Sequence, residues 1–259
     1  MRYAAASWTY AKKSPDVAEH ISKFVLLGYD TISFTPYQVL QWDSAGRAEV
    51  LAALAAHDLQ VTLHGNSVDT VANIVDLQDW LGSRLINYTM DGPMRWESLG
   101  TLFDGQAIGR HLSGVERATR GSKVRLGVED FPVDRRAWDA HARHLEPLAD
   151  SGRWGMLIDV GHYNLRRQFL PPPAEFLAGL PVPLLELHVH DNDGVTDQHG
   201  PIGFGNMDFA PFAQAVKAIG FDGVSTIEVA PSFHGRKPAE ALDESHTTLD
   251  AWRRLIQAG

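Results

Sequence analysis

The 259-residue chain contains no cysteine. Disulfide bonds, cysteine-ligated zinc and thiol catalysis are therefore excluded. The chain also has no run of about 18 consecutive apolar residues, so we expect no membrane-spanning helix. The first residues, MRYAAASWTYAKKSP, lack the continuous apolar stretch of a signal peptide and are typical of a first strand. Together these absences favour a cytoplasmic location.

Positive charge is also scarce. Lys and Arg total 23 against 32 Asp and Glu, which gives a formal net charge of −9. Binding to nucleic acid depends on Lys and Arg contacts to phosphate, and the chain has no basic cluster longer than Arg-Arg. We therefore expect neither a nucleic-acid partner nor a membrane partner.

Short apolar stretches typical of strands alternate with stretches of helical periodicity. Eight strands are predicted, at residues 2–8, 30–34, 60–64, 85–89, 124–129, 155–159, 184–190 and 224–229. Eight strand–helix units in about 250 residues predict a (β/α)8 TIM barrel, an α/β fold that we expect to form one domain over residues 1–259. The alternative, a doubly wound open sheet, normally carries a glycine-rich turn after its first strand, and none follows here.

The first and last helices have clear signals. Ser14 is the predicted N-cap of the first helix, Pro15 fits its first turn, and Gly28 is a suitable stop. Its apolar face is formed by Val17, Ile21 and Phe24. A second amphipathic helix near the C-terminus is predicted from Leu242, Leu249, Trp252 and Ile256.

Five predicted strands end with an aliphatic residue followed by an ionisable residue. The pairs are Leu63-His64, Val128-Glu129, Ile158-Asp159, Leu187-His188 and Ile227-Glu228. Side chains alternate along a strand, so the aliphatic residues should face the helices and the ionisable residues the barrel lumen. All five pairs lie at the C-terminal ends of strands, the face on which TIM barrels carry their active sites.

Histidines are concentrated at the same face. Six of the 12 lie at or just beyond the strand ends: His64, His162, His188, His190, His199 and His234. Three of these fall in LHVHDNDGVTDQHGPIGFG, residues 187–205, together with Asp191, Asp193 and Asp197. A single strand-end histidine is usually a packing residue, but six histidines on one rim, with three strand-end carboxylates, indicate a functional site.

Electrostatics indicates that this site binds a cation. Glu129, Asp159 and Glu228 should converge at the barrel mouth, where two carboxylates about 4 Å apart repel by roughly 4 kcal/mol at an effective dielectric of about 20. Three such groups need protons or a counter-charge, and no lumen-facing Lys or Arg lies beside them at the strand ends. We predict one divalent metal ion, with His188 as a fourth ligand; this set suits Mn²⁺, Co²⁺, Mg²⁺ or Zn²⁺.

Other residues receive supporting roles. Arg125 and Glu186 share the inward phase lower in the barrel and are interpreted as a buried structural pair. His190 and Asp191 are candidates to fix the ring of His188, and Asp193 is expected in a turn. Aromatic side chains can form an apolar wall against one face of a substrate: Trp8, Phe34, Phe131, Phe204 and Phe233. The loop 230–238 is either solvated or binds a substrate anion through His234, Arg236 and Lys237.

Four motifs, in order along the chain, resemble the xylose isomerase-like barrels, which include sugar isomerases and epimerases and the endonuclease IV group. They are GVED at 127–130, LIDVGHYN at 157–164, LHVHDND at 187–193 followed by DQHGPIGFG at 197–205, and TIEV at 226–229. The resemblance covers nearly the whole chain. It implies that Glu129, Asp159, His188 and Glu228 are the metal ligands and that His162 lies beside the substrate or a second metal.

The resemblance also implies a role for the loop after the seventh strand. In the endonuclease branch this segment ligates additional zinc, which makes Asp197 and His199 candidates for a second metal. That branch also uses a histidine from the third strand, where His64 fits, and one from the fourth. The fourth strand here reads LINYTMD and has no histidine, which weighs against a three-zinc phosphodiesterase. In single-metal members, the same loop closes over the substrate.

We predict a metal-dependent isomerase or epimerase of a small-molecule carbohydrate that works through a metal-stabilised enediolate. Glu129 and Glu228 are the predicted catalytic pair for proton transfer. His162, His64, His190 and Trp8 are the predicted substrate-binding residues. Two alternatives remain open: a dehydratase or lyase acting on a keto-sugar or cyclitol, and a zinc phosphodiesterase acting on DNA. A homo-oligomer also remains open.

Overall fold

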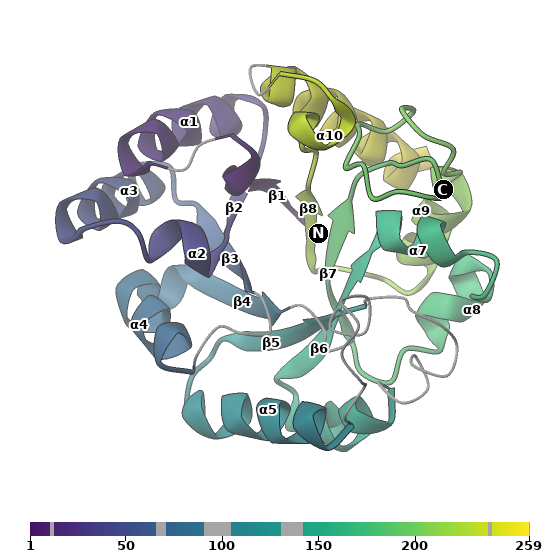
Figure 1. Cartoon of the computed structure of the whole chain (residues 1–259), viewed down its shortest axis with the longest axis horizontal. Helices are drawn as coiled ribbons and strands as arrows, with labels where there is room; N and C mark the ends of the chain where they lie inside the picture. The colour runs from purple at the N-terminus through teal and green to yellow at the C-terminus, as the bar shows by residue number, and fades with distance from the viewer. Residues whose placement is uncertain (11–12, 66–70, 91–104, 131–141, 238–239, 259) are drawn as a thin grey trace.

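The computed structural model describes residues 1–10, 13–65, 71–90, 105–130, 142–237 and 240–258. Its strands close into one parallel barrel in chain order, with β1 paired to β8, which confirms the predicted (β/α)8 fold (Figure 1). The strands are β1 Arg2–Ala6, β2 Thr31–Phe34, β3 Gln60–Gly65, β4 Leu85–Met90, β5 Arg125–Glu129, β6 Trp154–Asp159, β7 Leu184–Val189 and β8 Val224–Ile227.

Helices surround the barrel as an outer ring (Figure 1). The α-helices among the described residues are α1 Ser14–Leu26, α2 Pro36–Val39, α3 Ser44–Ala56, α4 Val71–Leu81, α5 Gly105–Ala118, α7 Val160–Arg166, α8 Pro173–Ala178, α9 Phe209–Ala218 and α10 Ala241–Ala258. Short 3-10 turns are η1 Ser7–Thr9, η2 Gly82–Arg84, η4 Glu146–Ser151 and η5 Pro231–His234. No helix in the described ranges has the length and apolar character needed to cross a membrane.

The predicted strands are all present, with shifts at their ends. The first strand stops at Ala6, because Ser7 begins a 3-10 turn, so its predicted extension to Trp8 is wrong. α1 starts at Ser14 with Lys13 as its N-cap, so the predicted capping role of Ser14 is also wrong. The apolar face of α1 is buried as predicted, and Gly28 adopts a φ of 92° just after the helix ends.

Alternate side chains along each strand point to two different environments, the helix layer outside the barrel and the lumen inside it. The aliphatic residues before each ionisable strand end are fully buried in the hydrophobic core: Leu63, Val128, Ile158, Leu187 and Ile227. Most side chains of the inward phase are small or polar and equally buried, as with Thr62, Asn87 and Thr226, although Leu157 is apolar. The barrel thus packs against its helices through apolar side chains and keeps a polar lumen that leads up to the strand ends.

Candidate metal centre

Three carboxylates at strand ends converge on the ring of His188, itself at the end of a strand. Its Nδ1 atom lies 2.9 Å from Glu228 Oε2, 3.6 Å from Glu129 Oε1 and 3.9 Å from Asp159 Oδ2. Glu129, Asp159 and His188 occupy the ends of β5, β6 and β7, and Glu228 follows β8 directly. None of the four is more than 5% exposed. Barrel closure therefore brings together the four residues predicted as metal ligands.

The chemistry of this set fits a divalent cation. Neither ring nitrogen of His188 has a hydrogen-bond partner of suitable geometry among the described residues, although both are buried. Asp159, His188 and Glu228 each offer a donor atom, and these atoms lie within 4.8 Å of one another. Three buried carboxylates around one unsatisfied imidazole nitrogen need positive charge between them. These residues can hold a metal ion.

Neighbouring histidines lower the pKa values of two carboxyl groups in the site, those of Glu228 and Asp159. Burial raises the pKa of Glu228, but the charge of the His188 ring, whose Nδ1 lies 2.9 Å away, outweighs burial and lowers this pKa to about 2. Burial likewise opposes ionisation of Asp159, yet His162 and His190 hold its pKa well below the usual range. Asp159 and Glu228 therefore stay ionised in the absence of an ion because cationic or hydrogen-bonding partners surround them, and an ion would take over that role.

A second group of donors lies beside the first. Asp197 Oδ2 is 3.3 Å from His162 Nε2 and 3.3 Å from His199 Nε2. The other nitrogen of each ring, Nδ1, faces a main-chain carbonyl. His162 Nδ1 lies 3.2 Å from the carbonyl oxygen of Asp130, and His199 Nδ1 lies 3.0 Å from that of Glu228. Burial lowers the pKa of His199, but its hydrogen bond to Asp197 prevails and raises this pKa to about 9. Asp197 and His199, the predicted second-metal residues, thus share a cluster with His162.

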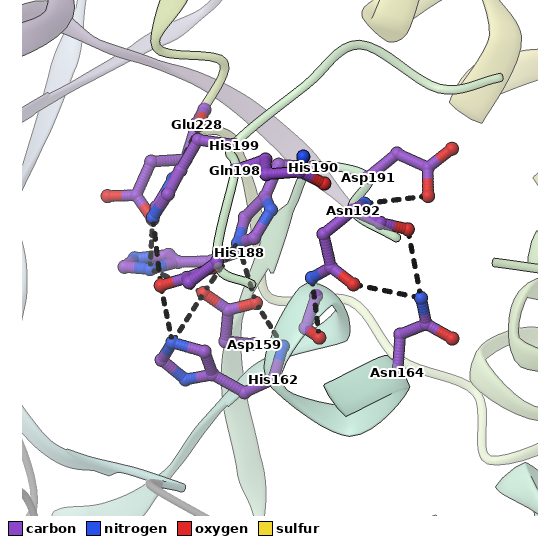
Figure 2. A network of polar contacts seen from close by, with 12 residues as sticks. Asp159, His162, Asn164, His188, His190, Asp191, Asn192, Gln198, His199 and Glu228 are labelled. Atoms are coloured by element: carbon purple, nitrogen blue, oxygen red, sulfur yellow. Dashed lines mark hydrogen bonds and ion pairs between the residues drawn. The ribbon is translucent and has the colours of Figure 1, made fainter. Parts of the chain in front are cut away.

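His190 connects the two groups. Its Nε2 atom donates to Asp159 Oδ2 at 3.1 Å, and its ring stacks on that of His199 with centroids 3.9 Å apart (Figure 2). Gly161 permits this position, because a Cβ there would collide with the His190 ring. The expectation that His190 fixes the ring of His188 is therefore wrong: it orients Asp159 instead.

Asp191 organises the loop that carries Asp197 and His199. Its backbone makes a two-way bridge to Gly200, and its carboxylate accepts the N–H groups of Gly203 and Gly205 at 3.0 and 2.9 Å. Asp191 therefore does not orient His188, contrary to expectation. Asp193 forms a turn as predicted, accepting the N–H groups of Val195 and Thr196.

His199 itself has a φ of 46°, in the left-handed region that non-glycine residues seldom adopt. Its carbonyl accepts the N–H of Ala230 at 2.9 Å, which helps to hold this conformation against β8. Strained backbone is concentrated at functional sites, where surrounding contacts keep it in place. The loop therefore presents His199 to the barrel mouth through fixed contacts.

The predicted substrate residues occupy different parts of the mouth. His64 lies 3.7 Å from Glu129 through Nε2 and bonds Thr89 through Nδ1. The indole N–H of Trp8 donates to Glu228 Oε1 at 3.2 Å, a contact that the sequence did not reveal. The ring centroids of Trp8 and Phe233 lie 6.0 Å apart, and both rings pack edge-on against the ring of His199.

Other aromatic and basic candidates have different positions. Phe34 is fully buried against Trp42 in the core, so its expected place in an apolar wall is wrong. Phe204 packs on His234, and Phe131 lies outside the described residues. In the loop 230–238, His234 and Arg236 both pair with Glu244, at 3.0 and 3.2 Å, which leaves these two side chains engaged within the protein.

The lower lumen also differs from expectation. Arg125 Nε donates to Asn87 Oδ1 at 3.1 Å, and Asn87 Nδ2 donates to Glu186 Oε2 at 3.2 Å. The predicted Arg125–Glu186 pair is therefore bridged by Asn87. Sequence reasoning missed Asn87, and also Asp130, whose carboxylate accepts the N–H of Asp159 at 2.7 Å. Asn87 could have been found from the alternation of side chains along its strand, which directs it into the lumen as it directs Arg125 on the next strand.

The sequence pattern of the xylose isomerase-like TIM barrel matches residues 23–252. The chain belongs to this family. An uncharacterized protein of Methanocaldococcus jannaschii is 32% identical over 139 residues, which are 51% of this chain and 46% of that protein. The chain thus matches about half the length of this curated relative.

Solved structures of the same fold cover nearly the whole chain. A D-tagatose 3-epimerase-like protein has a TM-score of 0.73 and 19% identity, covering 100% of this chain and 99% of its own. D-Psicose 3-epimerase from Clostridium cellulolyticum H10, solved with D-tagatose, has a TM-score of 0.72 and 13% identity, covering 99% of each chain. A xylose isomerase-like TIM barrel protein from Mycobacterium smegmatis in complex with magnesium has a TM-score of 0.65 and 14% identity, covering 98% of this chain and 97% of its own. At these identities the similarity shows the shared fold.

Proposed function

We propose that this protein is a divalent-metal-dependent epimerase or isomerase of a small sugar or sugar derivative. The observation that carries the proposal is the position of His188 Nδ1, within 3.9 Å of carboxylate oxygens from Glu129, Asp159 and Glu228 at the barrel mouth. Family membership supports it, as does the likeness of the fold to proteins named for sugar 3-epimerases.

Glu129, Asp159, His188 and Glu228 would hold one divalent ion. Three carboxylates and one imidazole suit Mn²⁺, Co²⁺, Mg²⁺ or Zn²⁺, and the magnesium-bound structure of similar fold supports the harder ions of this group. When bound, the ion supplies a Lewis acid beside the carbonyl and hydroxyl oxygens of an open-chain sugar.

Glu129 and Glu228 are the proposed proton-transfer pair. They come from β5 and from the residue after β8, and both approach the same nitrogen of His188. One carboxylate takes the proton from the carbon next to the carbonyl. The other, after taking a proton from solvent, gives that proton to the opposite face, which inverts the carbon. In an aldose–ketose isomerisation, one of them moves the proton alone.

Three other residues hold the reacting groups in place. Trp8 fixes the orientation of Glu228 by donating its indole N–H to Oε1, so that Oε2 faces His188. His64 Nε2 and His162 Nδ1 lie 3.7 and 3.8 Å from oxygens of Glu129, where their rings can also contact substrate hydroxyl groups. This placement supports their proposed role in substrate binding.

The convergence of His162, Asp197 and His199 favours a second ion position. Two ions in one mouth support hydrolysis of a phosphodiester, in which metals polarise the phosphoryl oxygens and activate water. The net charge of −9 weighs against a nucleic-acid substrate. Elemental analysis of the loaded protein separates the two functions: one ion per chain is expected for the epimerase, and two or three zinc ions for the hydrolase.

The proposed reaction is tested by incubating the metal-loaded protein in D₂O with D-tagatose, D-psicose and a panel of other ketoses and aldoses, followed by ¹H NMR. We expect a sugar to convert to its epimer or isomer with solvent deuterium at the reacting carbon, and Glu228→Gln to abolish this exchange. Loss of water from the product would instead favour the lyase. No exchange or turnover with any ion and any sugar would overturn the proposal.

A further inference from the structure

A fourth carboxylate lies in the lumen below the candidate metal centre. Glu186 is on β7 two residues before His188, so both side chains point inward. Glu186 is fully buried. Nothing in the proposed reaction uses it, and an ionised carboxylate in this position is costly unless it is hydrogen-bonded.

Three donors fix the carboxylate of Glu186. Its Oε1 atom accepts from Thr226 Oγ1 at 2.6 Å and from Thr62 Oγ1 at 3.2 Å, and Oε2 accepts from Asn87 Nδ2 at 3.2 Å. Asn87 cannot turn its amide around without loss, because its oxygen accepts from Arg125 Nε at 3.1 Å. Residues of β3, β4, β5 and β8 thus hold this carboxylate in one orientation.

The held carboxylate faces the lower edge of the His188 ring. Glu186 Oε1 lies 3.9 Å from His188 Nε2, a buried nitrogen that has no hydrogen-bond partner among the described residues. The other nitrogen of the same ring, Nδ1, faces the three carboxylates of the candidate metal centre. The ring therefore lies between two acidic environments, one at each nitrogen.

We propose that Glu186 is a positioning residue that keeps the N–H of His188 on Nε2 and leaves the lone pair of Nδ1 directed at the metal position. A histidine that ligates a metal donates its other N–H to a carboxylate or carbonyl, which fixes the tautomer and the ring orientation. The 3.9 Å between Glu186 Oε1 and His188 Nε2 is longer than a hydrogen bond. A small shift of the His188 ring would bring the two atoms into hydrogen-bond distance, or one water molecule would bridge them. The inference rests on the proposed function, because it takes His188 to be a ligand.

The test compares Glu186→Gln with Thr62→Val in Mn²⁺ titrations of chelator-treated protein. Glu186→Gln keeps the shape of the side chain but removes its charge, and we expect Mn²⁺ affinity to fall about 10- to 100-fold with the far-UV circular dichroism unchanged. Thr62→Val removes one of the bonds to Glu186 without changing the carboxylate, and its Mn²⁺ affinity should stay within about twofold of the parent.

A second measurement needs no Glu186 variant. In the zinc-loaded parent protein, ¹⁵N NMR of the His188 ring, assigned by its loss in His188→Asn, should show Nε2 protonated and Nδ1 without a proton. Parent protein that binds no Mn²⁺ would remove the proposed function and this inference together. Equal Mn²⁺ affinity in the parent protein and in Glu186→Gln would overturn this inference alone. A proton on Nδ1 would also remove His188 from the proposed metal centre.

Discussion

At the scale of single residues, two of the candidate ligands, Glu228 and Asp159, are each held by a second contact. Glu228 accepts the Trp8 N–H through Oε1 and faces His188 through Oε2. Asp159 accepts from His190 through its side chain, and its own backbone N–H bonds Asp130. Side chains fixed from two directions keep the geometry that metal binding and proton transfer require.

Removing either member of the proton-transfer pair should nearly abolish turnover. Glu129→Gln and Glu228→Gln each keep the size of the side chain but cannot accept the substrate proton, so kcat should fall about 10²- to 10⁴-fold. Steady-state kinetics on the substrate found in D₂O would measure this. Glu19→Gln, on the exposed surface of α1, is the control. Full turnover in both site variants would show that these carboxylates do not carry the proton.

Trp8→Phe isolates the contact between the indole and Glu228. Phenylalanine keeps an aromatic ring near His199 and Phe233 but loses the N–H donor. A hydrogen bond to a charged group contributes about 1.5 kcal/mol or more, so kcat/KM should fall at least about tenfold. Unchanged kcat/KM would mean that the position of Glu228 does not depend on Trp8.

At the scale of elements, the segment between β7 and β8 carries most of the second donor group. Residues 191–207 fold back on the strand end through the Asp191–Gly200 bridge and contact α10 through the bond from Ile202 N–H to Thr248. His234 on η5 extends the same support, with one ring nitrogen on the Gln198 carbonyl and the other on Glu244. The loop is thus held by contacts at the end of β7, with α10 and with η5.

Asp191→Asn should loosen this loop. The carboxylate accepts N–H groups through both oxygens, and an amide has only one acceptor oxygen, so at least one N–H of the loop loses its partner at a cost of about 1–3 kcal/mol. Amide hydrogen exchange at Gly203 and Gly205 should accelerate. Asp193→Asn, in the exposed turn of the same loop, should leave those two amides protected. Equal exchange in both variants would contradict the role of Asp191.

Gly161→Ala tests the close approach of α7 to His190. An added Cβ would collide with the His190 ring, so we expect a loss of about 1–3 kcal/mol of stability and displacement of His190 from Asp159. Gly114→Ala on α5 is the matched control, since in the described part of the chain no atom outside its own helix lies within 4 Å of the added Cβ, and it should be neutral or slightly stabilising. Denaturant unfolding of both variants provides the comparison. Equal stability would argue against the packing described.

Sequence alternation predicted the strands and the strand-end side chains that meet at the barrel mouth, because both depend on local phase. Leu63 and His64, or Leu187 and His188, differ by one position and therefore point to opposite sides of the barrel wall. The hydrogen-bond partners of the strand-end side chains were not predictable in this way. Trp8 reaches Glu228 across 220 positions of sequence, and Asp191 acts through a loop whose path depends on glycine geometry and long-range contacts.

At the scale of the whole molecule, closure of the barrel assembles the site from residues 129 to 228 of the chain. The parallel strands bring their C-terminal ends to one rim, and the helices supply the apolar packing that holds the rim together. The resulting cluster of carboxylates opposes folding unless a counter-charge is present. Metal binding and stability of the whole protein should therefore be coupled.

Chelator-treated protein should melt at a lower temperature than protein loaded with Mn²⁺. An ion that binds only the folded state stabilises it by about 2.7 kcal/mol at a free concentration of 100 times Kd. For a chain of this size, that corresponds to roughly 5–10 °C in Tm. His188→Ala should abolish the difference between the two conditions. Identical Tm values for the chelated and loaded parent protein would contradict metal binding to the folded state.

The most direct test of the central claim is an anomalous difference map from crystals of the protein soaked in Mn²⁺. We predict one strong peak about 2.0–2.3 Å from His188 Nδ1 and from oxygens of Glu129, Asp159 and Glu228. A peak only between His162, Asp197 and His199, or no peak at the barrel mouth, would contradict the assignment of these four residues as the metal centre.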